Sequence, residues 1–385
     1  MLRREQGAAG QRVTFVELFF DLVYVLAVTQ LSHLLLGSLN ARGGAHTALL
    51  LVAVWTAWIY NAWFTNWFDP DRRPVRLVLL GVMLASLLLS ATLPQAFGER
   101  GMVFAAAYVT MQVGRTLFVI AALADEPALR RNFQRILAWL VASGLLWLAG
   151  GAAHGTAREA LWLAAVAVDL AAPACGFFTP GLGRSRTTDW TITGGHMAER
   201  CQLFIIIALG ESLLVTGTSF GEHPLTAMAV AAFVVAFAGA VALWWVYFDR
   251  SAEAASGVIA GSADPGRLGR SAYTYCHLPM VAGIIVAAVG DELVLAHPGG
   301  HADAATTTTV LLGPALFLAG HALFKRLVFG RLSVPRLLAI AVLAGLWPLG
   351  ATVSPLLLSL AATLVVAAVA ASDSLIPREQ ARSLS

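Results

Sequence analysis

The chain has 385 residues, of which 58% are hydrophobic and only 12% are charged, and its mean hydropathy is +0.75. A soluble core of this length cannot hide so much apolar surface, so the composition excludes an ordinary water-soluble globular protein. It predicts an all-α, polytopic membrane protein whose first partner is the lipid bilayer.

The first apolar stretch, 13–36, is long enough to cross a bilayer and carries Glu17 and Asp21. It is too long and too acidic for a cleaved signal peptide, so we expect it to remain as the first span. The two carboxylates are four residues apart and share one helix face. Each costs about 2.5–3.5 kcal/mol inside the hydrocarbon region. Either they have a counter-charge or a task, or they form a solvated, acidic helix start at the membrane interface.

Apolar runs of about 20 residues, the length that a bilayer requires, recur along the whole chain and predict twelve spans. The boundary between the last two depends on only a few residues, Val353 to Pro355. The predicted spans are 13–36, 47–67, 76–97, 101–124, 134–153, 159–178, 199–220, 225–248, 270–296, 307–326, 335–353 and 355–373.

The basic residues alternate with these spans. Cytoplasmic loops are enriched in Lys and Arg, and nearly all of the 25 basic residues fall on one side of the predicted topology. The intervening segments hold only Arg42, Arg100 and Arg158, while Arg115 lies inside the fourth span. This alternation favours both termini in the cytoplasm of a multi-pass inner-membrane protein. The basic balance therefore reflects topology, and no nucleic-acid partner is expected.

Short matches in the same order suggest that the two halves are related. The segment 114–118 resembles 320–324, 67–69 resembles 247–249, and 135–138 resembles 336–339. Six spans is an even number, so such units would run in the same direction, as in parallel-repeat transporters. The hypothesis is a 6+6 repeat, with a first membrane unit at 1–178, a cytoplasmic connecting loop at 179–198 and a second membrane unit at 199–385.

Polar residues inside the spans are the candidate functional residues. With a rise of about 1.5 Å per helical residue, seven of them fall in the cytoplasmic half of the membrane and Glu211 falls near its middle. Their gathering in one layer predicts a hydrated cavity or a charge network that binds a substrate or ion. The strongest predicted pairing is that of Arg115 with Asp21 or Glu17. The full candidate set is Glu17, Asp21, Asn61, Arg115, Asp169, Glu211, His277 and His321.

Each candidate also has a structural interpretation. Arg115 could only lock the first and fourth helices together, and Asp169 could cap a kink before Pro173. Buried histidines are more often hydrogen-bonded packing residues than ligands. Glu211 is flanked by Gly210 and Ser212, whose small size admits either another helix or a solute.

The segment 179–200 contains glycines with Arg184 and Arg186, which suit either an anion or a positively charged cytoplasmic turn. His196 and Glu199 are too few to hold a metal. Three widely spaced cysteines indicate neither a disulfide framework nor a metal site. Without a nucleotide-binding or metalloprotease motif, we expect no cofactor and no metal.

Several of these segments resemble the low-temperature-requirement A family. The resemblance rests on 66–70 and 112–115 and, most specifically, on the first and seventh spans, through 15–23 with 28–32 and through 199–204 running to Leu209-Gly210-Glu211-Ser212. It covers most of the chain. It implies a bacterial multi-pass membrane protein associated with growth in the cold or under stress, and it leaves the molecular activity open.

Three functions from different classes remain. The first is a secondary transporter, proton- or cation-coupled, whose buried charges line a cavity. The second is a membrane enzyme acting on lipids or isoprenoids, with Asp21, Glu211 or a histidine as acid and base. The third is a non-transporting structural or stress-response protein. The sequence leaves the solute, the coupling ion and the oligomeric state open.

Overall fold

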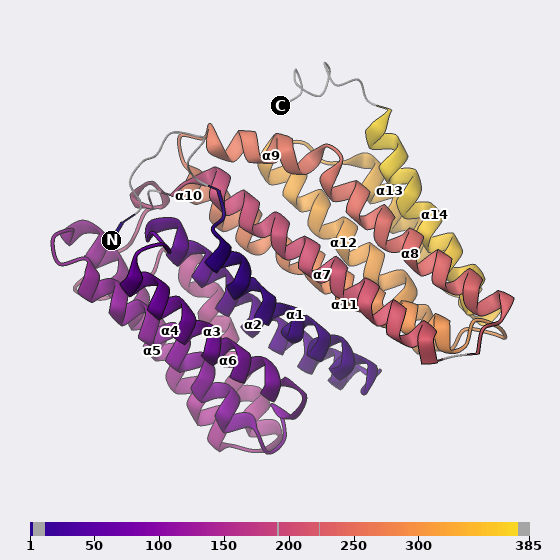
Figure 1. Ribbon diagram of the computed structural model, residues 1–385, viewed down its shortest axis with the longest axis horizontal. Coiled ribbons are helices and arrows are strands. Elements are labelled where there is room, and N and C mark those ends of the chain that lie inside the picture. Colours follow the sequence, from indigo (N-terminus) through magenta and orange to yellow (C-terminus); the bar gives the residue numbers. More distant parts are fainter. Residues whose placement is uncertain (3–11, 191, 223, 376–385) are drawn as a thin grey trace. The chain divides into compact units, whose positions relative to one another are not determined.

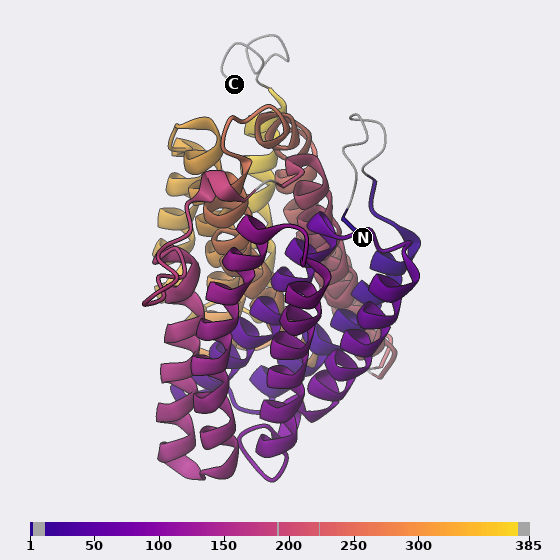
Figure 2. The ribbon, with the colours of Figure 1, turned by 90° about the vertical axis from the view of Figure 1, so that its left-hand side faces the viewer.

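The computed structural model describes residues 1–2, 12–190, 192–222 and 224–375, and helices dominate it (Figures 1 and 2). This confirms the predicted all-α class. The chain divides into two compact units. The first contains residues 1–34, 42–197 and 263–270, and the second contains 35–41, 198–262 and 271–385.

The first unit is built from six long helices, and in both views α3 to α6 lie side by side as a bundle (Figures 1 and 2). A 3-10 turn, η1 (Leu93–Gln95), extends α3, and another, η2 (Thr187–Asp189), packs against the short α10 (Pro265–Leu268). The long helices are α1 (Phe15–Leu36), α2 (Ala41–Trp67), α3 (Arg73–Thr92), α4 (Gly101–Ala122), α5 (Pro127–Ala152) and α6 (Gly155–Ala174).

The second unit contains most of α7 and the helices that follow it. Here α11 packs closely on α12, and α8 packs on α14. The elements are α7 (Gly194–Glu222), α8 (Ala227–Phe248), α9 (Ser251–Ala260), a π-helical turn (Gly269–Tyr275), α11 (His277–Ala296), α12 (Ala304–Phe329), α13 (Val334–Gly345), the 3-10 turn η4 (Trp347–Ala351) and α14 (Pro355–Ser374).

Among the described residues, eleven helical segments are long and apolar enough to cross a membrane. Every predicted span coincides with a helical segment, including the last two, which η4 and Pro355 separate. The sixth predicted span is α6, and it is not one of the eleven. It has 20 residues but carries three charged side chains, Arg158, Glu159 and Asp169, so no 18-residue stretch of it has fewer than three charges.

Outward-facing apolar side chains show how these helices meet lipid. On α3, the exposed residues Leu77, Leu80, Leu84 and Leu87 follow one another at helical spacing and form a single stripe. Leu77 and Leu84 are each 69% exposed. A stripe of this kind would be unfavourable in water and is favourable against hydrocarbon, so the bilayer contact predicted from composition is supported.

Glycines explain the close approach of α11 and α12. Gly283 and Gly290 lie seven residues apart on α11, and Gly313 and Gly320 lie seven apart on α12. A Cβ atom added at Gly283 would lie 2.5 Å from the backbone nitrogen of Phe317, and one at Gly313 would lie 2.5 Å from that of Ala287. Small residues at these positions let the two backbones touch, which is how many membrane helices associate.

Arg158 is a buried cation with a structural role in the first unit. Its side chain is 2% exposed, and it donates to five backbone carbonyl oxygens where η1, α5 and α6 meet. These carbonyls belong to helix ends that lack intrahelical partners. The acceptors are those of Ala96, Gly98, Gly150, Gly151 and Ala153.

Helix α7 begins at Gly194, five residues before the start that hydropathy predicted. The preceding segment is tied to α5, because Arg135 donates from Nε and Nη2 to the Leu182 carbonyl oxygen at 2.8 and 2.6 Å. The early start of α7 places His196 on a helix of the first unit rather than in a loop.

Candidate functional site

The first predicted carboxylate, Glu17, lies in the opening turn of α1 and is fully buried. The Thr14 backbone N–H donates to its Oε2 at 2.8 Å, and the Thr14 hydroxyl donates to the same oxygen at 2.9 Å. The spacing Thr14-x-x-Glu17 is that of a capping box, in which the third helical residue binds back to the cap. Glu17 is therefore an acidic helix start, as one of the two alternatives held, but it is not solvated.

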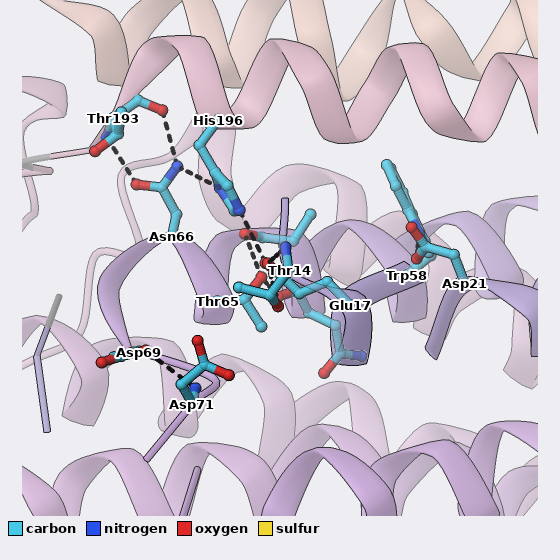
Figure 3. Close-up of polar contacts among 12 residues, drawn as sticks. Thr14, Glu17, Asp21, Trp58, Thr65, Asn66, Asp69, Asp71, Thr193 and His196 are labelled. Carbon is cyan, nitrogen blue, oxygen red and sulfur yellow. Dashed lines mark hydrogen bonds and ion pairs between the residues drawn. The ribbon is translucent and has the colours of Figure 1, made fainter. Parts of the chain in front are cut away.

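The other oxygen of Glu17 contacts α7. Its Oε1 lies 2.8 Å from Nε2 of His196, a residue that is also fully buried (Figure 3). On the opposite side of the imidazole, Nδ2 of Asn66 lies 3.2 Å from Nδ1 of His196. Asn66 is held in turn by the backbone of Thr193, which donates its N–H at 2.7 Å and accepts at 2.9 Å.

These contacts fix the orientation of the Asn66 amide beside His196. The Thr193 N–H requires the Asn66 oxygen and the Thr193 carbonyl requires the Asn66 amide nitrogen, so the amide cannot be flipped. Asn66 therefore presents N–H to Nδ1, which acts as an acceptor. The Nε2 nitrogen faces the Glu17 carboxylate and donates to it.

Asp21, one turn deeper on α1, binds to α2. Trp58 donates its indole N–H to Oδ1 of Asp21 at 2.8 Å, and both side chains are buried (Figure 3). Three residues further along α2, Asn61 donates to the Ala57 carbonyl at 2.8 Å, and its own Oδ1 is buried without a hydrogen-bond partner among the described residues. The predicted Asn61 thus lies near the same helix pair.

Arg115 does not pair with Asp21 or Glu17, so the predicted ion pair is wrong. The guanidinium, 3% exposed, donates from Nη2 to Oε1 of Gln112 at 2.6 Å and stacks over the Tyr60 ring at 5.6 Å. Its Nη1 is buried and has no hydrogen-bond partner in the part of the chain that the structure describes. The physical reason is the direction of the side chain, since Arg115 bonds back along its own helix.

A chain of neutral groups links Arg115 to Asp169. Gln112 donates from Nε2 to the Tyr108 hydroxyl at 3.4 Å, and Tyr108 donates to Oδ2 of Asp169 at 2.8 Å. Trp147 on α5 donates its indole N–H to the same oxygen at 3.0 Å. Asp169 is therefore a hydrogen-bonded junction of α4, α5 and α6, and not a cap for a kink at Pro173.

The second unit holds the predicted histidines in one aromatic cluster. Nε2 of His277 accepts from the Tyr247 hydroxyl at 2.7 Å, and its Nδ1 lies 3.2 Å from the Ala272 carbonyl oxygen. The rings of His277 and His321 lie 5.1 and 6.1 Å from that of Phe324. These contacts agree with the packing interpretation of the two histidines.

His321 also accepts from a charged neighbour. Nε of Arg336 donates to Nδ1 of His321 at 2.9 Å, and the same guanidinium donates hydrogen bonds to both carboxylate oxygens of Asp373. Lys325 lies 3.7 Å from that carboxylate. This cluster joins α12, α13 and α14. Sequence patterns gave no signal for it, because a basic residue at the start of the predicted span 335–353 fits the cytoplasmic end of a helix.

Glu211 is buried on α7 at 3% exposure, and its neighbour Ser212 lines a cavity of the second unit. The candidates divide between the two units. Glu17, Asp21, Asn61, Arg115 and Asp169 belong to the first unit, and Glu211, His277 and His321 belong to the second. No group of three or more His, Cys, Asp or Glu side chains that could hold a metal ion occurs within the described ranges.

An open hollow of about 510 Å³ lies at the start of α1. Its lining includes Thr14, the residue whose two donors bind Glu17, together with Arg12, Asp71 and Arg76. Glu17 thus lies directly behind a residue that faces the hollow. The hollow has charges of both signs and could admit a hydrated ion.

Long apolar helices with an outward stripe of leucine and an interior of bonded polar residues define a polytopic helical membrane protein. The chain matches the family model described as bacterial low temperature requirement A protein (LtrA) over residues 12–371, and it belongs to that family. It is 36% identical to an uncharacterized protein of Rhizobium meliloti (strain 1021) over 324 aligned residues. The alignment covers 84% of this chain and 79% of that relative. No solved structure matches the chain.

Proposed function

We propose that this protein is a secondary transporter, driven by a proton or cation gradient, in the bacterial inner membrane with both termini in the cytoplasm. The observation that carries the proposal is Arg115, a buried guanidinium that contacts no carboxylate among the described residues. A buried charge costs several kcal/mol unless it is paired and fully hydrogen-bonded. Arg115 has one neutral acceptor, one aromatic ring and an unsatisfied Nη1.

This arrangement favours a task for Arg115 over a purely structural role. An arginine that locks two helices together is expected to form an ion pair across them, whereas Arg115 hydrogen-bonds within α4 and reaches α2 only through the Tyr60 ring. A guanidinium that forms no ion pair with a protein carboxylate can instead form one with an anionic solute. Ionisable groups within transmembrane segments commonly mark such pathways.

The carboxylates of α1 supply the second half of the proposal. Glu17 lies behind Thr14 at the edge of the open hollow, and Asp21 lies one turn further along the same helix face. The two acids thus lie one after the other, leading from the hollow into the first unit. Glu17 and Asp21 are the groups we propose to exchange protons or cations during transport, and Glu211 plays the same role in the second unit.

A structural function is the second candidate, and the Glu17 network favours it. Three donors, two from Thr14 and one from His196, satisfy this carboxylate in a geometry that also ties α1 to α7. Such a network could serve packing alone. On that account the protein would support membrane integrity in the cold or under stress without moving a solute.

Currents from reconstituted vesicles distinguish the two. Native protein and the variants Glu17→Gln, Asp21→Asn, Arg115→Gln and Glu211→Gln are exposed to concentration jumps of phosphate, acetate, succinate, glutamate and lysine, with and without a pH gradient. A transporter gives a solute-dependent current that the variants lose while their unfolding temperature in detergent is retained. Arg42→Gln is the matched control, because Arg42 is 65% exposed and pairs with Glu159 at the surface. Native protein without current, with variants that unfold, would establish the structural function instead.

A further inference from the structure

A cavity of about 30 Å³ lies inside the second unit, between α7, α8, α11, α12 and α14. A buried water needs roughly 10–15 Å³ of such space, so the cavity holds one or two occupants of that size. Its wall contains one carboxylate, Asp291, and three hydroxyl groups, those of Ser212, Ser359 and Thr363. Alanine, leucine and valine side chains make up most of the remainder.

Asp291 is not explained by any contact with the rest of the protein. It lies on α11 five residues before the helix ends, and no hydrogen bond or ion pair joins it to another described residue. It is half-buried and lines the cavity. A carboxylate in this position needs a positively charged or hydrogen-bonding occupant to offset its desolvation.

The backbone of α12 has an unusual hydrogen-bonding pattern beside the cavity. Pro314 is inside this helix and has no N–H, so the Val310 carbonyl cannot receive the hydrogen bond that residue 314 would supply in a regular α-helix. Val310 and Pro314 both line the cavity. Interrupted transmembrane helices whose freed carbonyls coordinate a cation are a recurring device in secondary transporters.

We propose that this cavity binds one sodium ion, with the Asp291 carboxylate, the hydroxyls of Ser212, Ser359 and Thr363, and the Val310 carbonyl oxygen as its ligands. All five groups are the hard oxygen donors that such a cation prefers. One carboxylate neutralises one monovalent ion, whereas a divalent ion would leave a net charge in a low dielectric. The small volume favours sodium over potassium.

The position of the cavity suits a coupling ion. It lies toward the end of α11 and the beginnings of α12 and α14, which the predicted topology places in the outer half of the membrane. Sodium would then enter from outside, down its gradient. This role as a coupling ion rests on the proposed transport function, whereas binding itself does not.

Sodium binding is tested with the full-length protein in detergent, by thermal unfolding as NaCl replaces choline chloride at constant ionic strength. A ligand that binds only the folded state raises the unfolding temperature in a saturable way. The native protein should show this rise with sodium and not with potassium or calcium chloride. Asp291→Asn should abolish the response, and it is expected to fold because it removes a buried charge without changing shape.

Two further variants complete the test. Pro314→Ala restores the N–H of residue 314, withdraws the Val310 carbonyl, and should weaken the apparent sodium affinity about tenfold. Ser372→Ala, on the same helix as Ser359 and Thr363, removes a hydroxyl that donates to the Val369 carbonyl at 2.7 Å and should leave the response unchanged. The absence of a sodium response in native protein, or an equal response in Asp291→Asn, would overturn the proposal.

Vesicle currents separate this proposal from the transport function. Sodium stabilisation without any solute current would retain the binding site and refute transport. A solute current that is the same in sodium and choline, with no stabilisation by sodium, would retain transport and refute the site.

Discussion

Two buried arginines of the first unit differ in how their donors are used. Arg158 and Arg115 are 2% and 3% exposed, yet Arg158 donates to five backbone carbonyls while Arg115 reaches one amide oxygen and leaves Nη1 without a partner. Burial alone therefore does not mark a functional residue. The unmet hydrogen-bonding capacity of a buried charge is the better sign, since a purely structural group is expected to be satisfied.

The largest effect on stability is expected from Arg158→Met. The substitution keeps the apolar stem but leaves five carbonyl oxygens without their donor, and each buried unsatisfied group costs about 1–3 kcal/mol. Because some carbonyls will find water, we expect a loss of about 3–5 kcal/mol in the free energy of unfolding. Denaturant unfolding in detergent measures this loss. An unchanged midpoint would mean that Arg158 does not stabilise the fold and so does not differ from Arg115 in this way.

Arg336→Gln should have the next largest effect. It leaves Asp373 with only Lys325, at 3.7 Å, and removes the donor to His321. Breaking a buried pair from one side costs about 3 kcal/mol, and removing both charges with Arg336→Met and Asp373→Leu together should recover most of it. If the double variant were as unstable as the single one, the pair would not be the cause.

Tyr108→Phe tests the chain that joins Arg115 to Asp169. The loss of one hydroxyl, which donates to Asp169 at 2.8 Å, should cost about 1 kcal/mol of unfolding free energy. Because Trp147 still donates to the same oxygen at 3.0 Å, the unit should remain folded. A loss of several kcal/mol would mean that the chain holds the helices together, as Arg158 does.

The smallest effect concerns an exposed charge. The Thr306 backbone N–H donates to Asp303 at 2.7 Å at the start of α12, and this bond holds the pKa of the carboxyl below its usual range. A lowered pKa means that the cap stabilises the fold above the unfolded value near pH 4 and is lost as pH falls through the folded value. Asp303→Ala should cost about 0.5–1 kcal/mol at pH 7. This loss of unfolding free energy, measured by denaturant unfolding as a function of pH, should become smaller below about pH 4. A loss that does not change with pH would show that the ionised Asp303 carboxylate is not its cause.

Much of the fold could be predicted because the bilayer imposes it. Apolar runs of fixed length predict the helices, including α6, although α6 carries three charged side chains, Arg158, Glu159 and Asp169. Hydropathy predicts the start of α7 too late, at residue 199, because the residues from Gly194 to Ala198 are not apolar enough to register as part of a span. The spacing Thr14-x-x-Glu17 would have identified Glu17 as the beginning of α1.

The partners of the buried charges could not be predicted in the same way. Asp21 accepts a hydrogen bond from the indole N–H of Trp58, and hydropathy scales, which treat tryptophan as apolar, do not reveal such a donor. Arg115 turns toward Gln112 because a long side chain can reach along its own helix, and only coordinates reveal its direction. Asp291 was overlooked because an acid near the end of a span is ordinarily solvated.

The most direct test of the transport proposal is the solute-dependent current of vesicles containing native protein, Arg115→Gln or the control Arg42→Gln, at matched unfolding temperatures. We predict a current in native and Arg42→Gln vesicles and its loss in Arg115→Gln. Equal currents in all three would contradict the account, as would an Arg115→Gln protein that fails to fold.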